Sequence, residues 1–115
     1  QLIEEIKESY QVEISNKKFK VSKMFYETFE LIKEDLINNL LSLPEFKNKE
    51  FQTIFTGHSL GGALATISSF YCIERNLIES EPILLTFGQP GVGNQQFAEY
   101  VTKNIKQIYN KNNGK

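Results

Sequence analysis

The sequence predicts an α/β fold with a mostly parallel sheet that is flanked by helices on both faces. Helix-like and strand-like segments alternate from residue 22 onward, and this order is typical of parallel sheets with crossover helices. The run "ILLTF" at 83–87 is apolar throughout, as expected for a parallel strand. Glycine-rich turns follow two of the strands, at Gly57 and Gly88. In sheets of this kind, ligands bind at the carboxyl ends of the strands.

Length and composition restrict the function classes. The chain has 115 residues and 40 % hydrophobic residues, which suits one small domain or a piece of a larger one. The formal net charge of −1 argues against a nucleic acid partner. Cys72 is the single cysteine, so neither an internal disulfide nor a Cys/His zinc site is expected, and we predict a buried role for it. No apolar run approaches the ~20 residues of a transmembrane helix.

The first nineteen residues are ambiguous and form an uncertain N-terminal segment. Its beginning, "QLIEEIKESY", is acidic and mixed, unlike a signal peptide, so the compartment stays open. Leu2, Ile3 and Ile6 have helical spacing, whereas two later groups alternate as strands do. These groups are Tyr10, Val12 and Ile14, and then Phe19 and Val21. With "SNKK" between them, they are consistent with a hairpin.

The stretch from Ser22 to Leu43 is the clearest predicted helix. Its apolar residues recur every three or four positions and form one stripe, which we expect in the core: Phe25, Phe29, Ile32, Leu36, Leu40 and Leu43. Ser22 is a candidate N-cap, and Pro44 marks a stop.

The remaining elements follow in alternating order. We expect a strand over 50–56, a buried helix over Leu60–Arg75, the strand at 83–87, and the loop "GQPGVGN". A third helix should begin with Asn94 as its cap and end near Lys103, and "IKQIY" at 105–109 is a further strand.

The residues Gly57-His58-Ser59-Leu60-Gly61 match the G-x-S-x-G pattern of a nucleophile elbow. In that turn a serine lies between a strand and a helix, so that its hydroxyl projects beyond the sheet. We expect a Cβ at Gly57 or Gly61 to clash with the turn. Gly62 then lets the helix pack closely on the sheet. The N–H of Leu60 points toward an oxyanion formed at Ser59. The alternative to a nucleophile is a purely structural role, in which the glycines begin a tightly packed helix and Ser59 has no catalytic function.

The second glycine loop offers a weaker motif, that of a dinucleotide site. Gly88, Gly91 and Gly93 lie between a strand and a helix, but G-x-G-x-x-G fails at Gln96. The acidic residue expected some twenty positions later is absent from this chain as well. No P-loop pattern occurs in the sequence either, so no nucleotide cofactor is expected.

"TGHSLGGALA" followed by "TFGQPGVGN" resembles the class 3 lipases, the fungal-lipase-like branch of the α/β-hydrolases. "FKVSKMFYETFELIKEDL" is similar to the family segment that leads to the helix before the nucleophile strand. The resemblance implies a partial α/β-hydrolase fold with a nucleophile elbow. Residues 20–115 would be the central, incomplete part of such a domain.

The same resemblance implies hydrolysis of acylglycerols or related lipid esters at a membrane or droplet interface, with no metal or organic cofactor. Ser59 matches the nucleophile and Leu60 the backbone oxyanion donor, while Gly57, His58, Gly61 and Gly62 match structural positions of the motif. Family members are often secreted or lipid-associated.

The chain departs from the family in three places. Ser22 and Met24 stand where the family has His and Gly, and Gly91 stands where it usually has Arg. The family triad runs Ser, Asp, His. Here the single Asp, Asp35, precedes Ser59, and the single His is His58, inside the elbow. The triad Asp and His are therefore missing from this chain. The alternative function is a non-catalytic, lipase-like lipid-binding or interaction module.

Overall fold

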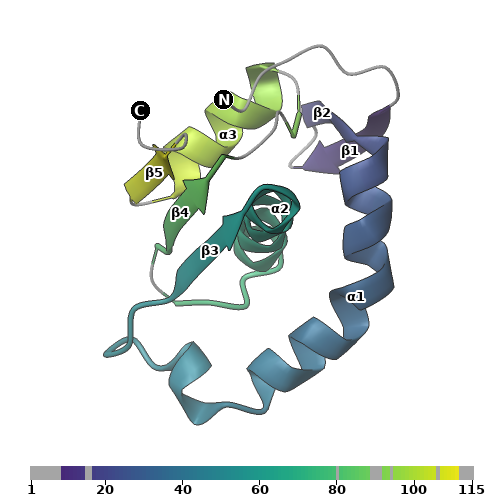
Figure 1. Cartoon of the computed structure of the whole chain (residues 1–115). Helices are drawn as coiled ribbons and strands as arrows, with labels where there is room; N and C mark the ends of the chain where they lie inside the picture. Colours follow the sequence, from purple (N-terminus) through teal and green to yellow (C-terminus); the bar gives the residue numbers. More distant parts are fainter. Residues whose placement is uncertain are drawn as a thin grey trace.

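A computed structural model describes residues 9–14, 17–79, 81–88, 92–93, 95–105 and 107–111. Its elements follow the chain in alternating order (Figure 1). They are β1 Ser9–Ile14, β2 Lys17–Ser22, α1 Lys23–Leu41, the short 3-10 helix η1 Pro44–Lys47, β3 Ile54–His58, α2 Leu60–Glu74, β4 Ile83–Phe87, α3 Gln95–Asn104 and β5 Gln107–Lys111. The alternation of helices and strands that the sequence predicts is confirmed.

The central sheet is parallel and has the order β3-β4-β5. Because the order advances in one direction, right-handed crossovers bring α2 and α3 to the same face of the sheet. Leu84 of β4 accordingly lies in one buried cluster with Ile67 of α2 and Val101 of α3. The expectation of helices on both faces is wrong for the described part of the chain. Alternation along a sequence does not reveal whether the strand order reverses, and only a reversal moves a helix to the other face.

β4 shows the same asymmetry residue by residue. Leu84 and Thr86 are buried on the helix side, whereas Ile83 and Leu85 are half-buried and Phe87 is exposed. The apolar run "ILLTF" is therefore covered more completely on one face than on the other within the described structure.

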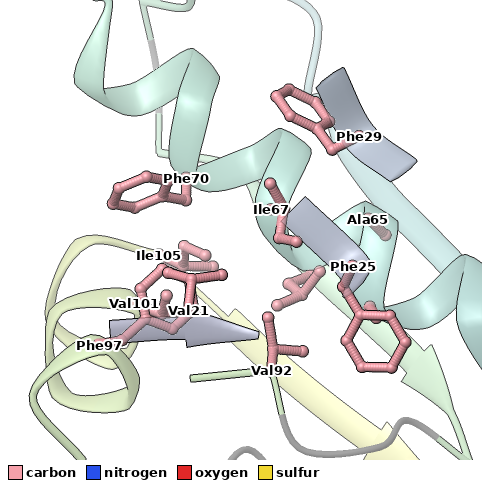
Figure 2. Close-up of a cluster of buried hydrophobic side chains, with 12 residues drawn as sticks. Val21, Phe25, Phe29, Ala65, Ile67, Phe70, Val92, Phe97, Val101 and Ile105 are labelled. Atoms are coloured by element: carbon pink, nitrogen blue, oxygen red, sulfur yellow. The ribbon is translucent and has the colours of Figure 1, made fainter. Parts of the chain in front are cut away.

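The core lies between the sheet and the helices. Figure 2 shows buried side chains from α1, α2 and α3 converging there, among them Phe29, Ile67 and Phe97. The Phe70 ring contacts the Phe97 ring at a centroid distance of 5.1 Å, which joins α2 to α3. Such tilted aromatic pairs contribute about 0.5–1.5 kcal/mol beyond the area they bury. Cys72 is also fully buried, as predicted.

The predicted hairpin is present as β1 and β2, which pair antiparallel from Ser9↔Ser22 to Ile14↔Lys17. It is joined to the second glycine loop, because Val21 forms an antiparallel bridge with Gly93. The Ser22 N–H donates to the Val92 carbonyl at 2.5 Å. Ser22 is the N-cap of α1, as expected, but its side chain makes no capping hydrogen bond.

The apolar stripe of α1 is only partly in the core. Phe25 and Phe29 are buried, whereas Ile32 is 41 % and Leu43 51 % exposed. The helix ends at Leu41, so Leu43 lies beyond it. Leu36 is partly buried against the core, so the predicted core stripe is confirmed for Phe25, Phe29 and Leu36 and is wrong for Ile32 and Leu43. Helical spacing identifies an apolar face, but not how far along the helix a partner covers it.

Two strands are shifted from their predicted positions. β3 begins at Ile54 because Asn48 organises the preceding residues into a turn, in which its Oδ1 accepts the Glu50 N–H at 2.9 Å. β5 begins at Gln107 because Ile105, directly after α3, is still bonded to that helix: its N–H donates to the Val101 carbonyl at 3.1 Å. Ile105 is buried with α3 in the core.

Three predictions fall on residues outside the described ranges. They are the helical spacing of Leu2, Ile3 and Ile6, the N-cap at Asn94, and the loop position of Gly91, where the family usually has Arg. Within the described ranges, no helix combines the length and the apolar character that crossing a membrane requires.

Candidate active site

Ser59 makes the turn between β3 and α2 by itself. β3 ends at His58 and α2 begins at Leu60, so one residue reverses the direction of the chain. Ser59 has φ 53° and ψ −118°. A positive φ is uncommon for a residue with a Cβ, and such strained conformations cluster at functional sites. The Ser59 N–H donates to the Phe87 carbonyl at 2.8 Å, which holds the turn against the end of β4.

Gly57 is required by the close approach of α2. A Cβ at Gly57 would lie 2.2 Å from the Gly61 carbonyl oxygen and 2.7 Å from the Gly62 nitrogen, both of which are backbone atoms. A Cβ at Gly61 would meet nothing within 4 Å. The prediction that a Cβ would clash with the turn is therefore confirmed for Gly57 and wrong for Gly61 in the described structure. Gly62 and Ala63 are buried, consistent with close packing of α2 on the sheet.

The first turn of α2 presents free backbone donors beside Ser59. The Ser59 carbonyl accepts the N–H groups of Gly62 at 2.9 Å and Ala63 at 3.2 Å. The N–H groups of Leu60 and Gly61 have no acceptor among the described residues. The Ser59 side chain makes no capping hydrogen bond to the helix. The hydroxyl thus has no structural hydrogen bond among the described residues, and unpaired N–H groups at a helix N-terminus favour negative charge next to it.

His58 is part of the elbow but makes no contact typical of a catalytic base. It is exposed and pairs in register with Phe87 across the sheet. Among the described contacts, its imidazole makes no hydrogen bond to Ser59.

Five carboxylates that could serve as an acid make no described contact with Ser59. Asp35 lies on α1, and Glu99 lies on α3. Glu79 and Glu81 precede β4 and are therefore at the amino ends of the strands, opposite the elbow. Glu74 ends α2, where it accepts a hydrogen bond from the Tyr100 hydroxyl at 3.1 Å. In the described structure, none of these five groups is brought together with Ser59 and His58.

The polar groups of α2 have structural roles. The Thr66 hydroxyl donates to the Gly62 carbonyl at 3.0 Å, and the Ser69 hydroxyl donates to the Thr66 carbonyl at 2.8 Å. Burial raises the pKa of the Cys72 thiol to about 11, so the thiol is not an alternative nucleophile at neutral pH. Burial and then the Glu74 carboxylate raise the pKa of Tyr100 to about 12, which keeps its hydroxyl protonated as a donor.

The described residues at the end of the second glycine loop pack against the hairpin and α3. Val92 is fully buried, and a Cβ at Gly93 would lie 2.7 Å from both the Lys20 carbonyl oxygen and the Phe97 ring. Together with the Val21 bridge, this contact fixes the hairpin against the loop that leaves β4.

Phe87 is a site residue that the sequence did not single out. It ends β4, its carbonyl holds the Ser59 N–H, and its ring is 39 % exposed. Leu60, directly after Ser59, is 44 % exposed. Two residues with large, exposed apolar side chains are therefore neighbours of Ser59, Phe87 through a backbone hydrogen bond and Leu60 in the sequence. The signal in the sequence is the position of Phe87, directly before the glycine that ends a buried strand.

Comparisons with known proteins agree on one family. The model of the family described as "Lipase (class 3)" matches residues 1–114. Secreted mono- and diacylglycerol lipase 1 of Fusarium solani is 37 % identical over 79 residues, which are 68 % of this chain and 22 % of that protein. A lipase of Rhizomucor miehei is 38 % identical over 85 residues, or 71 % of this chain and 23 % of its own length. The chain thus spans less than a quarter of these relatives.

Solved structures show the same fold. The Rhizomucor miehei lipase in complex with its propeptide superimposes with a TM-score of 0.71 at 26 % identity, over 91 % of this chain and 34 % of that one. A fungal lipase in complex with an inhibitor gives a TM-score of 0.72 at 29 % identity, over 90 % and 40 %. The partial α/β-hydrolase fold is therefore confirmed.

Proposed function

Because the chain belongs to the class 3 lipase family, we propose that it supplies the nucleophile for hydrolysis of lipid esters. Ser59 is the nucleophile and the Leu60 N–H is an oxyanion donor. The observation that carries this assignment is the conformation of Ser59, a strained non-glycine residue between strand and helix with a hydroxyl that caps nothing. The free Leu60 N–H beside it is the second support.

The proposed chemistry is acyl transfer in two steps. The Ser59 Oγ attacks the ester carbonyl carbon while a base takes the hydroxyl proton, and the carbonyl oxygen becomes an oxyanion held by the Leu60 N–H. The C–O bond to the alcohol breaks, and the alcohol leaves with that proton. Water then attacks the acyl-serine by the same route, which releases the fatty acid and restores Ser59.

The base and its orienting acid are proposed to lie outside residues 1–115. The single Asp and the single His of this sequence are Asp35 and His58. The former lies in α1, and the latter makes no described contact with Ser59. Without a base, a serine hydroxyl is a weak nucleophile at neutral pH.

Residues 20–115 are proposed to be the central part of a class 3 lipase domain, preceded by an N-terminal segment. β3 ends the strand order within the described sheet. The Thr53 carbonyl accepts from Ile83, and the Ser59 N–H donates to Phe87, so the backbone groups of the alternate residues between them face away from β4. An unpaired edge at the nucleophile strand supports the need for further polypeptide.

Acylglycerols or related lipid esters are the proposed substrates. Their hydrolysis is proposed to take place at a membrane or droplet interface. The support is the names of the relatives, one of which is a mono- and diacylglycerol lipase. Within the described residues, no group of three His, Cys, Asp or Glu side chains could hold a metal ion.

A non-catalytic, lipase-like binding module is the second candidate. It is favoured by the lack of a described base or acid next to Ser59. Such a module would keep the fold and the apolar residues beside Ser59 but would not turn over esters.

Labelling with a fluorophosphonate separates the two candidates. The protein is isolated from its cells of origin through a tag on the chromosomal gene, treated with the probe and analysed by peptide mass spectrometry. We expect one adduct, on Ser59, because an activated serine attacks phosphorus as it attacks an ester carbon. Ser42→Ala is the matched control, since that exposed hydroxyl only donates to the Asn39 carbonyl. If Ser59 carries no label while known serine hydrolases in the same lysate do, the binding module is the correct function.

A further inference from the structure

Two cationic side chains, one from α1 and one from α2, lie against the ring of Tyr71. The guanidinium carbon of Arg75 is 5.0 Å and the Nζ of Lys33 is 5.6 Å from the ring centroid. Burial and then the Glu30 carboxylate raise the pKa of the Tyr26 hydroxyl. The charges of Lys33 and Arg75 lower the same pKa, so both cations lie close enough to act on this second phenol. The α1–α2 basic cluster is formed by Tyr26, Lys33, Tyr71 and Arg75.

Several hydrogen-bond donors of the basic cluster are unused. Among the described residues, the guanidinium of Arg75 has neither a hydrogen bond nor an ion pair, although it carries five N–H groups. The Tyr71 hydroxyl has no described hydrogen bond either. Lys33 pairs with Glu30 at 2.9 Å, but an ammonium group has three N–H donors. Because Arg75 is exposed and lies over a half-buried ring, its guanidinium is positioned by Tyr71 and still open to a ligand.

We propose that the basic cluster binds a phosphate group, which belongs to a phospholipid head group or to a soluble phosphate ester. A phosphate monoester has three terminal oxygens to accept from Arg75, Lys33 and Tyr71, whereas a carboxylate has two. The guanidinium fork matches two of these oxygens at once. The cluster lies at the far end of α2 from Ser59, because Arg75 is the C-cap of this helix and its 15 residues span about 22 Å. The phosphate site is therefore separate from the candidate nucleophile.

Glu30 is the carboxylate that faces the basic cluster, and its charge competes with a phosphate for Lys33. It is paired with the Lys33 ammonium and accepts a hydrogen bond from the Tyr26 hydroxyl. Glu30→Gln removes the negative charge but keeps an oxygen that accepts from both groups. We therefore expect this variant to bind phosphate about two- to fivefold more tightly, as for the loss of one exposed ion pair. A gain of affinity cannot result from misfolding, so this variant makes the test decisive.

Arg75 provides a direct readout, because it is the single arginine of the sequence and its Nε–H gives one nitrogen-15 NMR signal. The 115-residue chain is titrated with glycerol 3-phosphate, and with acetate as the carboxylate comparison. We expect a saturable shift of the Arg75 signal with glycerol 3-phosphate and about tenfold weaker binding of acetate. Lys33→Gln and Tyr71→Phe should each weaken phosphate binding about tenfold. Lys49→Gln removes the same charge from an exposed turn residue and should have no effect.

Vesicles separate the two sources of the phosphate group. The chain and its Arg75→Gln variant are sedimented with phosphatidylcholine vesicles that contain or lack phosphatidic acid. Sedimentation of the unmodified chain alone, and only with phosphatidic acid, assigns the head group, whereas an Arg75 shift without sedimentation assigns a soluble ester.

Three results would overturn the proposal. They are an Arg75 signal that does not respond to glycerol 3-phosphate, a Lys49→Gln effect as large as that of Lys33→Gln, and weaker binding by Glu30→Gln. Ser59→Ala should leave the titration unchanged, so the phosphate site is tested separately from the proposed nucleophile.

Discussion

Replacement of Gly57 by alanine should destabilise the chain severely. The added Cβ would lie 2.2 Å from the Gly61 carbonyl oxygen, and neither backbone segment can move without separating β3 from α2. Because the contact is with backbone rather than with a flexible side chain, we expect a loss of about 3 kcal/mol or more in the free energy of unfolding. Such a loss is a large fraction of the stability of a small domain. Urea denaturation followed by circular dichroism measures it.

Gly61→Ala is the matched control for that experiment. Its Cβ would enter open space, and alanine is favoured over glycine in a helix by up to about 1 kcal/mol. We expect a stability equal to or slightly above that of the unmodified chain. A severe loss for Gly61→Ala, or a tolerated Gly57→Ala, would show that the elbow does not have the described geometry.

Ser59→Ala should abolish ester hydrolysis by the protein isolated from its cells of origin. Removal of the nucleophile from a serine hydrolase lowers kcat by about 10⁴-fold or more, because the acyl-enzyme route is lost and only binding and oxyanion stabilisation remain. Hydrolysis of a monoacylglycerol in dispersed form measures the effect. The variant should fold normally, since the Ser59 hydroxyl makes no capping hydrogen bond.

Ser42→Ala is again the control, and its rate should equal that of the unmodified protein. A Ser59→Ala protein that retained the full rate would place the nucleophile elsewhere and would refute the proposed mechanism.

The sequence was sufficient for the elements around the elbow. Local signals define these elements: residues of high strand propensity before Gly57, a helical pattern after Ser59 and an apolar run at 83–87. The turn at Ser59 and the close contact at Gly57 follow from the chemistry of the motif itself. These features depend on residues that are neighbours in sequence, and for that reason a pattern of five residues indicates them.

Features that depend on tertiary arrangement could not be predicted in the same way. The spacing of the α1 stripe is regular through Leu43, yet among the described residues only Phe25 and Phe29 of the stripe are fully buried, while Ile32 and Leu43 are exposed. The alternation of elements did not reveal that α2 and α3 share a face, because that depends on the direction of the strand order. The role of Phe87 depends on its register with His58, which joins residues far apart in the sequence.

The claim that this chain holds the nucleophile but not its base is tested most directly on the 115 residues alone. The chain and its Ser59→Ala variant are assayed side by side with a chromogenic short-chain ester, which needs no lipid interface. We expect both proteins to hydrolyse it at the same background rate, because the single His of this sequence, His58, makes no described contact with Ser59. A clear rate that disappears with Ser59→Ala would contradict this claim and would require a base among residues 1–115.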